Sequence, residues 1–256
     1  MMKNRGFHYE TQRYVDKTIT GQESGIKNKY MNSYVDFVRK YVKEGSKVLD
    51  LGCGAGLSSG LLSKHFKVIG ADLSRPAISY AKSHFKNIKF QVEDARKMSF
   101  DNETFDATLA CGFIEHVYEV DEVLSEMLRV TKKNGHVIIV SPNWFSPFRS
   151  IKAFITPKGY EIVGRNKLQV TGWFLKSIYY TVQKQMNPKY VFRYPDVYKE
   201  ELVGNDMDMF YIANQFDIKK FFKKKGCNVI KTNADTFAFS SIPALATWIG
   251  IVAKKV

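Results

Sequence analysis

The stretch Val48-Leu49-Asp50-Leu51-Gly52-Cys53-Gly54-Ala55-Gly56 decides the fold. The run from Lys47 to Leu51 is short and mostly aliphatic, as in a strand that is buried on both faces. It meets a turn with glycine at positions 52, 54 and 56, where the missing Cβ atoms let the backbone adopt positive φ and approach a ligand. Helical spacing follows from Leu57 to His65. This order of strand, glycine turn and helix predicts a cradle for a ligand.

Two other nucleotide-binding motifs share this order of elements but differ in spacing. The dinucleotide fingerprint requires its third glycine three residues after the second, and that position is occupied here by Leu57. A phosphate-binding P-loop requires Gly-Lys-Ser or Gly-Lys-Thr, and no such sequence follows Gly52. Asp50 would repel a pyrophosphate and attract an ammonium group. We therefore expect a cationic ligand rather than a phosphorylated one.

The glycine stretch resembles the first motif of the class I S-adenosylmethionine-dependent methyltransferases. Later segments resemble the second to fifth motifs of that family, and their order and spacing agree over residues 46 to 143. The resemblance implies S-adenosylmethionine as the cofactor. The segments are Val68 to Ser74, Val92 to Ala95, Phe105 to Cys111, and Leu128 to Asn143.

Strand and helix patterns alternate along the rest of the chain. Strands are expected at 67–72, 88–92, 105–111 and 136–141, and Asn134-Gly135 is expected to break the chain before the last of these. The pattern predicts an α/β fold with a parallel sheet and helices on both faces. The resemblance to the methyltransferase family further implies that this sheet is Rossmann-like, doubly wound, mostly parallel and seven-stranded. A late helix at 216–225 and strands at 228–232 and 247–254 would complete it.

Four segments are expected. Residues 1–45 form an N-terminal helical segment, where Ile26, Tyr30, Tyr34, Val38 and Val42 recur every four residues. Residues 46–143 form the cofactor-binding core, 144–215 an insert after the fifth strand, and 216–256 the end of the core. In similar methyltransferases the N-terminal segment often closes over the cofactor, so position 13, an arginine, would either meet the ligand's carboxylate or belong to a surface arm.

Ligands of such sheets bind outside the carboxyl ends of the strands. Asp72 stands 20 residues after Gly52, the distance at which an acid in the related Rossmann arrangement binds ribose hydroxyls. The resemblance implies that Leu73 contacts the adenine ring, that Asp94 accepts from its amino group, and that the Ala95 amide donates to a ring nitrogen. For Asp94, a helix cap is the alternative. The expected cofactor-binding residues are Asp50, Gly52, Gly54, Gly56, Asp72, Leu73, Asp94, Ala95 and Cys111, the last through its carbonyl.

His116 is the candidate catalytic residue. Methyl transfer from a sulfonium is an in-line displacement, so orientation supplies most of the catalysis and a base is optional. His116 follows the fourth strand, and an imidazole can remove a proton from a hydroxyl acceptor near neutral pH. The preferred alternative is that Glu115 favours the start of the following helix and His116 only packs, because the Glu-His-Val triplet recurs in the family with different acceptors.

The insert is aromatic and basic. Thirteen aromatic residues lie between Trp144 and Tyr198, and ten Lys or Arg stand against four acids from 144 to 201. Phe174, Ile178 and Val182 share one helical face with Met186. The insert is either a lid over the acceptor or a small helical subdomain packed for its own stability.

The formal charge of +14 at pH 7 would suit nucleic acid, anionic lipid or an acidic substrate. No recognisable RNA-binding module occurs, which argues against nucleic acid, and the charge is also compatible with a solvated basic surface. The Asn-Pro-Pro-Tyr type motif of amino-group methyltransferases is absent from the fourth strand, which argues against N-methylation. Three cysteines without metal-ligand spacing indicate reduced thiols and no metal site. With no apolar run near the roughly 20 residues of a membrane span and no signal-peptide pattern, a cytoplasmic protein is expected.

These observations predict a methyltransferase that acts on a small or lipid-like acceptor, at a hydroxyl, with contact to an anionic membrane as an option. Two alternatives stay open. An RNA methyltransferase would bind RNA with a steep salt dependence. A non-catalytic S-adenosylmethionine-binding protein would keep Asp72 and Asp94 but lack a vacant acceptor cavity.

Overall fold

The computed structural model describes residues 7–11, 14–16, 19, 25–143, 145–147, 151, 167–192, 210–232 and 248–256. The elements of these residues are η1 (Phe7–Glu10), α2 (Gly25–Arg39), β1 (Lys47–Leu51), α3 (Leu57–Leu62), β2 (Lys67–Asp72), α4 (Arg75–His84), β3 (Lys89–Val92), β4 (Phe105–Cys111), η2 (Ile114–His116), α5 (Val120–Val130), β5 (Thr131–Pro142), α7 (Lys167–Met186), α8 (Gln215–Lys224), β6 (Asn228–Thr232) and β7 (Trp248–Lys254).

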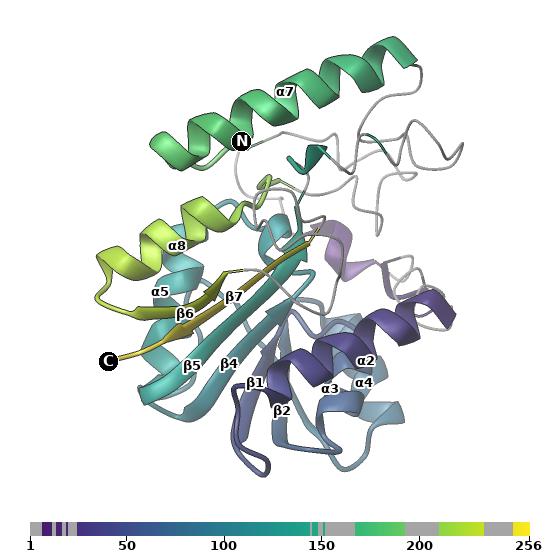
Figure 1. The fold of residues 1–256 in the computed structure, drawn as a ribbon. Helices are drawn as coiled ribbons and strands as arrows, with labels where there is room; N and C mark the ends of the chain where they lie inside the picture. Colours follow the sequence, from purple (N-terminus) through teal and green to yellow (C-terminus); the bar gives the residue numbers. More distant parts are fainter. Residues whose placement is uncertain are drawn as a thin grey trace.

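The seven strands form one sheet in the order β3-β2-β1-β4-β5-β7-β6, shown in Figure 1. Strands β1 to β5 are parallel, and β7 runs antiparallel to both of its neighbours, β5 and β6. This confirms the predicted Rossmann-like, mostly parallel sheet. Strand β1 pairs with β2 on one side and β4 on the other, so the strand order reverses between them. A ligand is expected outside the carboxyl ends of these strands.

Apolar side chains alternate between the two faces of the sheet. On β1, Leu49 and Leu51 belong to the core cluster shared with α5 and α8, whereas Val48 belongs to the cluster shared with α2. Successive residues of a strand point to opposite faces, so an aliphatic strand serves both cores. Helix α2 lies in front of the sheet in Figure 1, and α5 lies behind it.

Local signals in the sequence explain where α4 begins. Ser74 is its N-cap and accepts a hydrogen bond from the Ala77 amide at 3.2 Å, and a proline stands in its first turn. The predicted break before the fifth strand is wrong. Strand β5 begins at Thr131 and runs through Asn134, which has φ of 64° in an irregularity of the pairing with β4. Asn tolerates this left-handed conformation, so the strand bulges and continues.

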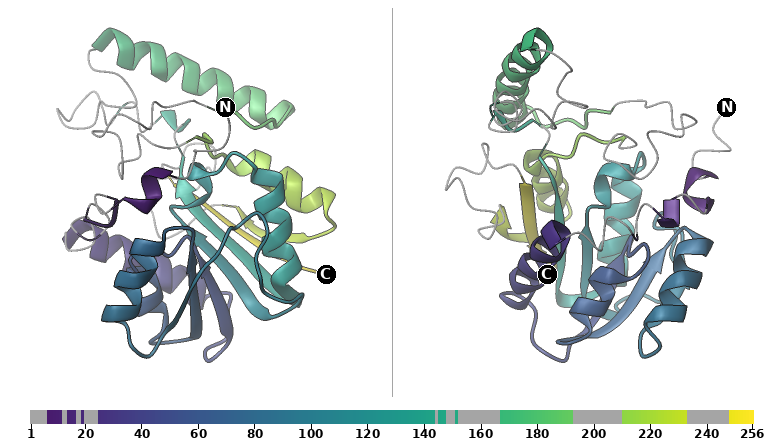
Figure 2. Two further views of the ribbon diagram at one scale, coloured as in Figure 1. Left: turned by 180° about the vertical axis from the view of Figure 1, so that it is seen from behind. Right: turned by 90° about the vertical axis from the view of Figure 1, so that its right-hand side faces the viewer.

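Helix α7 lies along the edge of the molecule, above the sheet in Figure 1 and outermost in both views of Figure 2. Two contacts fix it there. The Lys184 ammonium is paired with the buried carboxylate of Asp217 on α8. The Thr181 hydroxyl donates to the carbonyl of Phe145, which follows β5, at 3.1 Å. The helix therefore lies on the side where β5 ends.

No helix among the described residues combines the length and the apolar character that crossing a membrane requires.

Candidate functional site

The glycine turn after β1 has left-handed backbone at each of its three glycines. The φ angles of Gly52, Gly54 and Gly56 are 73°, 52° and 91°. A Cβ at Gly56 would lie 3.0 Å from the side chains of Ala81 and Phe90, so this glycine lets α3 pack closely against α4 and β3. Its assignment to the cofactor stays a prediction.

Gly52 lies directly beneath an aromatic ring. A Cβ at this position would lie 2.3 Å from the ring of Phe113, and the Gly52 amide donates to the Ala71 carbonyl at 2.8 Å. This contact could not be expected from the sequence, because Phe113 comes from the loop after β4. The close approach that the glycine allows is thus used by the protein itself.

Asp50 is buried and faces α3. Its Oδ2 accepts hydrogen bonds from the hydroxyls of Ser58 at 2.7 Å and Ser59 at 2.6 Å. Burial raises the pKa of Asp50 to about 6, although the two serine hydrogen bonds act against this. Near it, the hydroxyl of Tyr34 is buried and has no hydrogen-bond partner in the described part of the chain, and the Asp50 charge contributes to the raised pKa of Tyr34.

Asp72 connects the glycine turn to α4. Its Oδ2 accepts from the Gly54 amide at 2.8 Å, and its Oδ1 accepts from the Ser74 amide at 2.9 Å. Burial raises the pKa of Asp72, while the amide hydrogen bonds and the nearby His116 oppose that rise. Each carboxylate oxygen has a second lone pair, so both can still accept a ligand hydroxyl. Next to it, Leu73 is 41% exposed, and Val92 at the end of β3 is 39% exposed.

Asp94 lies two residues beyond β3 and is paired with Arg96. The Arg96 Nε and Nη2 atoms donate to both carboxylate oxygens at 2.7–3.1 Å, and the Arg96 amide donates to Oδ1 at 2.9 Å. These hydrogen bonds lower the pKa of Asp94. No helix starts here, so the helix-cap alternative for Asp94 is wrong. Ala95 is half-buried beside it.

Cys111, at the carboxyl end of β4, touches α2. Its Sγ lies 3.2 Å from the Tyr30 hydroxyl. Burial raises the pKa of the Cys111 thiol, so it is a neutral thiol at physiological pH. Tyr30 packs against Trp248 in a tilted arrangement with ring centroids 4.4 Å apart. Helix α2 therefore closes one side of the strand ends.

Glu115 does not support the following helix. Its carboxylate is buried and accepts from the Ser141 hydroxyl at 2.9 Å, and its carbonyl accepts from the Phe210 and Tyr211 amides at 2.8 and 2.9 Å. Helix α5 begins only at Val120 and has its own acids in its first turn. Glu115 instead joins the loop after β4 to β5 and to the segment before α8. Half-buried His116 is the next residue, in η2.

The N-terminal segment reaches the same edge of the sheet. The Ser74 hydroxyl donates to the carbonyl of Tyr9 in η1 at 2.5 Å, and Tyr9 packs edge-on against Tyr14. The arginine at position 13 lies outside the described residues. The contact brings this segment beside Asp72 and Leu73. That the segment closes over the cofactor stays a prediction.

Aromatic side chains of the insert pack against the residues that follow β5 and η2. Phe145 stacks on Tyr180 at 4.5 Å and on Trp173 at 6.3 Å. Tyr118, after η2, stacks on Phe210 at 4.1 Å. Trp173 thus takes part in packing between α7 and the end of β5.

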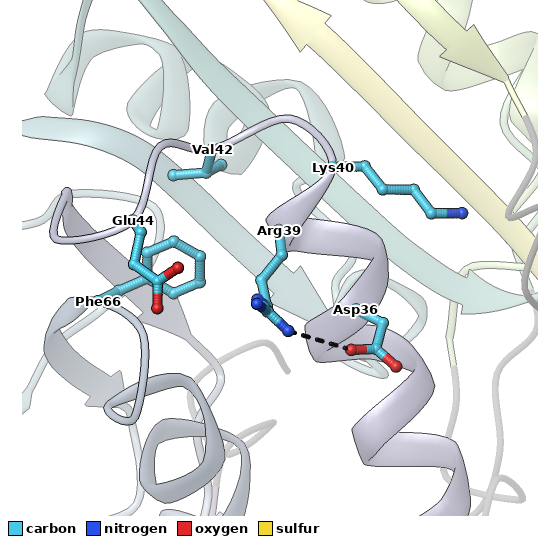
Figure 3. Close-up of a pocket in the computed structure, with 6 residues that line it drawn as sticks. All are labelled: Asp36, Arg39, Lys40, Val42, Glu44 and Phe66. Carbon is cyan, nitrogen blue, oxygen red and sulfur yellow. Dashed lines mark ion pairs between the residues drawn. The ribbon is translucent and has the colours of Figure 1, made fainter.

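A shallow hollow of about 200 Å³ lies elsewhere, at the amino ends of β1 and β2 (Figure 3). Its charges have both signs and Arg39 is paired with Asp36 at 3.7 Å. It lies at the end of the sheet opposite to the glycine turn, so it does not belong to the candidate site. The six lining residues are Asp36, Arg39, Lys40, Val42, Glu44 and Phe66.

Comparison with known proteins identifies the core. Residues 49–139 match the family model described as "Methyltransferase domain". The chain is 36% identical over 103 residues to a phosphatidylethanolamine N-methyltransferase of Cereibacter sphaeroides, covering 38% of this chain and 51% of that protein. It is 31% identical over 135 residues to a ubiquinone biosynthesis O-methyltransferase of Coxiella burnetii, covering 49% and 54%. The chain spans about half the length of the curated relatives it matches.

The fold extends beyond the family match. A solved S-adenosylmethionine-dependent methyltransferase of Aquifex aeolicus superposes with a TM-score of 0.56 at 14% identity, covering 93% of this chain and 97% of that chain. At this identity the similarity shows the fold alone. The family match ends before residue 144, so it leaves the insert uncharacterised.

Several side chains of the site were not predicted from the sequence. Ser58, Ser59, Phe113 and Ser141 contact the expected site residues from neighbouring loops and elements. The serines stand in the first turn of α3, a position that the spacing after Gly56 could have suggested. The other two depend on how β4 and β5 are aligned.

Proposed function

Because the chain belongs to the class I S-adenosylmethionine-dependent methyltransferases, we propose that it transfers a methyl group from S-adenosylmethionine to a small or lipid-like acceptor, at a hydroxyl group. The main observation in support of the proposed cofactor site is the position of Asp72. Its carboxylate joins the Gly54 and Ser74 amides at the carboxyl end of β2, between the glycine turn and two exposed apolar side chains.

The residues at this edge fit the cofactor. Asp72 would accept from the ribose hydroxyls, and exposed Leu73 and Val92 offer apolar surface to an adenine ring. At the other end, Asp50 would attract the ammonium group of the methionine part, and the unpartnered Tyr34 hydroxyl would lie near it. The carbonyls of Gly52, Gly54 and Cys111 would complete this half of the site, because the Gly52 and Gly54 amides already donate to Ala71 and Asp72. The bound cofactor supplies an electrophilic methyl group; the protein orients the acceptor.

Asp94 can bind the cofactor only in competition with Arg96, with which it forms an ion pair. Its carboxylate is shared with Arg96, so an adenine amino group would have to use a remaining lone pair or displace the guanidinium. The Ala95 amide is the alternative contact in the same turn.

The hydroxyl acceptor is supported by the O-methyltransferase relative and by His116 after β4. The phosphatidylethanolamine N-methyltransferase relative favours a second candidate, an amine on a lipid-like acceptor. For either acceptor we propose a cytoplasmic location and contact with an anionic membrane. The three free thiols, Cys53, Cys111 and Cys227, suit a reducing compartment.

Calorimetry tests the cofactor. S-adenosylmethionine should bind and NAD should not, and Asp72→Asn should weaken binding by about 1.5–3 kcal/mol, as for a lost charge-assisted hydrogen bond. Asp106→Asn is the matched control, because this carboxylate accepts from the Lys47 amide at 2.7 Å at the amino end of β4. Tight NAD binding, or equal effects of both substitutions, would refute the proposed site.

Transfer of a labelled methyl group into a lipid extract tests the reaction. Mass spectrometry of the product separates O-methyl from N-methyl, and label in RNA instead would point to the nucleic-acid alternative. If His116 removes the acceptor proton, His116→Gln should slow turnover by about 10²–10⁴-fold without weakening the cofactor. A smaller loss would assign His116 to packing, and no transfer with intact cofactor binding would favour a non-catalytic binding protein.

A further inference from the structure

Helix α7 presents an apolar surface to solvent. Among the described residues, eleven large apolar side chains are exposed, and six of them lie on this one helix. Their exposed fractions run from 41% to 84%, so the helix is not buried by the described part of the chain. The six residues, called here the outer face of α7, are Leu168, Leu175, Ile178, Tyr179, Val182 and Met186.

The outer face lies opposite the side that anchors the helix. The buried residues of α7 are Val170, Ser177, Thr181 and Lys184. Of these, Thr181 contacts Phe145 and Lys184 contacts Asp217 on α8. With 3.6 residues per turn, Leu175 and its successors at 179 and 182 fall on the other side. Figures 1 and 2 show α7 at the outer edge of the molecule in every view, with no other helix or strand beyond it.

Positive charge borders this face. Helix α7 contains no acidic residue, and exposed Lys167 and Lys176 fall on its two borders. The Lys176 ammonium lies 5.7 Å from the ring centroids of Trp173 and Tyr180. These two rings lie between the outer face of α7 and its buried side. The third lysine of the helix, Lys184, is buried in its ion pair and adds nothing to the surface. The border is therefore cationic on both sides.

We propose that the outer face of α7 docks the protein on the surface of an anionic phospholipid bilayer. A helix that lies in a membrane interface has an apolar side, lysines beside it and aromatic or aliphatic anchors, and anionic headgroups attract its lysines. The formal charge of +14 on the whole chain acts in the same direction.

A second copy of the chain fits this face less well. A two-fold dimer would bring each outer face against its own copy, so the lysine borders would meet lysines. With no acid on α7, neither Lys167 nor Lys176 could find a partner on the facing helix. An anionic bilayer supplies the negative charge that a second copy lacks.

Docking through α7 would turn the strand ends toward the membrane, because the helix lies on the side where β5 ends. A lipid-like acceptor could then reach the site from the bilayer. This consequence rests on the proposed methyl transfer, whereas the docking surface itself does not.

Vesicle co-sedimentation of the full chain without cofactor tests the surface. The protein should bind phosphatidylcholine vesicles that contain phosphatidylglycerol and bind pure phosphatidylcholine poorly. Binding should fall when salt is raised from about 0.1 M to about 1 M, which shortens the screening length from about 10 Å to about 3 Å. The variant Leu175→Gln/Val182→Gln should bind at least about tenfold more weakly, a loss of about 1.4 kcal/mol, because two apolar side chains no longer enter the interface.

Ile230→Gln is the matched control, because Ile230 is an exposed isoleucine, 44% exposed, on β6. It should bind as the wild type does, and thermal unfolding should show all variants folded. Equal binding by the double variant and the wild type would overturn the proposal. So would equal binding to both vesicle types, or a wild-type dimer in sedimentation that the double variant abolishes. Since no step requires methyl transfer, failure here overturns the membrane contact and leaves the proposed methyl transfer standing.

Discussion

Asp50 and Asp72 are buried carboxylates at the carboxyl ends of adjacent strands, and different donors hold them. Two serine hydroxyls donate to Asp50, whereas two backbone amides donate to Asp72. A hydroxyl can rotate to donate or accept, so it serves a protonated carboxyl as well as an ionised one. Asp50 is therefore suited to change its charge state, and Asp72 to stay ionised.

The stability of the cofactor-free protein should report the ionisation of Asp50. Its pKa is raised by burial from 3.8 to about 6, so its stabilising contribution is complete below pH 3.8 and is lost as pH rises through 6. The free energy of unfolding should fall by about 3 kcal/mol over this range relative to Asp50→Asn. Urea unfolding at several pH values measures it, and parallel profiles for the two proteins would contradict the raised pKa.

Gly52→Ala should destabilise the protein more than a glycine substitution of equal backbone strain. The new Cβ would meet the Phe113 ring at 2.3 Å, and φ is 73°. At Gly226, φ is 76° and nothing lies within 4 Å of the new atom, so Gly226→Ala costs only the left-handed strain, about 1–2 kcal/mol. Gly52→Ala should add about 1–3 kcal/mol for the clash. Equal losses in urea unfolding would mean that the Phe113 ring moves aside freely.

At the scale of elements, the attachment of α7 depends on a buried ion pair. Burial lowers the pKa of Lys184 and raises the pKa of Asp217, and their mutual attraction opposes both shifts. The Tyr211 hydroxyl donates to the same Asp217 oxygen at 3.2 Å, and the Lys189 carbonyl accepts from Lys184 at 2.9 Å. The pair therefore links three segments of the chain.

Removing one partner should cost more than removing both. Lys184→Met leaves the Asp217 carboxylate buried without its cation, which should lower the free energy of unfolding by about 3–5 kcal/mol. The double variant Lys184→Met/Asp217→Leu should recover most of this loss, since no buried charge remains. Chemical denaturation compares them. A double variant as unstable as the single one would show that the pair stabilises through geometry rather than charge compensation.

The helices show where sequence patterns predict packing and where they do not. The stripe Val120, Val123, Leu124, Met127 and Leu128 of α5 is buried as its spacing indicates, because the opposite face of that helix is polar. Helix α7 has apolar residues on both sides. Its stripe through Ile178, Val182 and Met186 is exposed, and a side with Thr181 and Lys184 is buried. The contacts of α7 with Phe145 and Asp217 determine which side is buried, and neither residue is near this helix in the sequence.

The same limit applies to the candidate site. The glycine turn, Asp72 and the strand ends could be located from the sequence, since they depend on local spacing and on where a strand stops. The partners of these residues could not. That Arg96 would hold Asp94, or that Ser141 would bind Glu115, depends on side-chain directions set by the assembled sheet.

At the scale of the whole molecule, the family match is smaller than the folding unit. It covers residues 49–139, yet β7, which lies between β5 and β6, contributes side chains to both core clusters. Ile249 and Ile251 join the cluster with α5 and α8, and Val252 joins the cluster with α2. The residues that match the family cannot complete either core.

A fragment of residues 1–143 should therefore fail to fold. It retains every expected cofactor residue but leaves β5 as an open, apolar edge, which favours aggregation. Circular dichroism during heating should show no cooperative transition, and S-adenosylmethionine should not bind. A cooperative transition with cofactor affinity like that of the full chain would show that β7 is dispensable.

The place of β7 also bears on how the chain is made. On the ribosome, β1 to β5 emerge before the insert, α8 and β6, and only then does Trp248 become available to pair with Pro142. Until that moment the nascent chain carries an unpaired strand edge, and its central pairing has a long sequence separation, which slows folding. The interval between synthesis of β5 and β7 is thus the period in which the nascent chain is most exposed to misassembly, and in which chaperones would have most to protect.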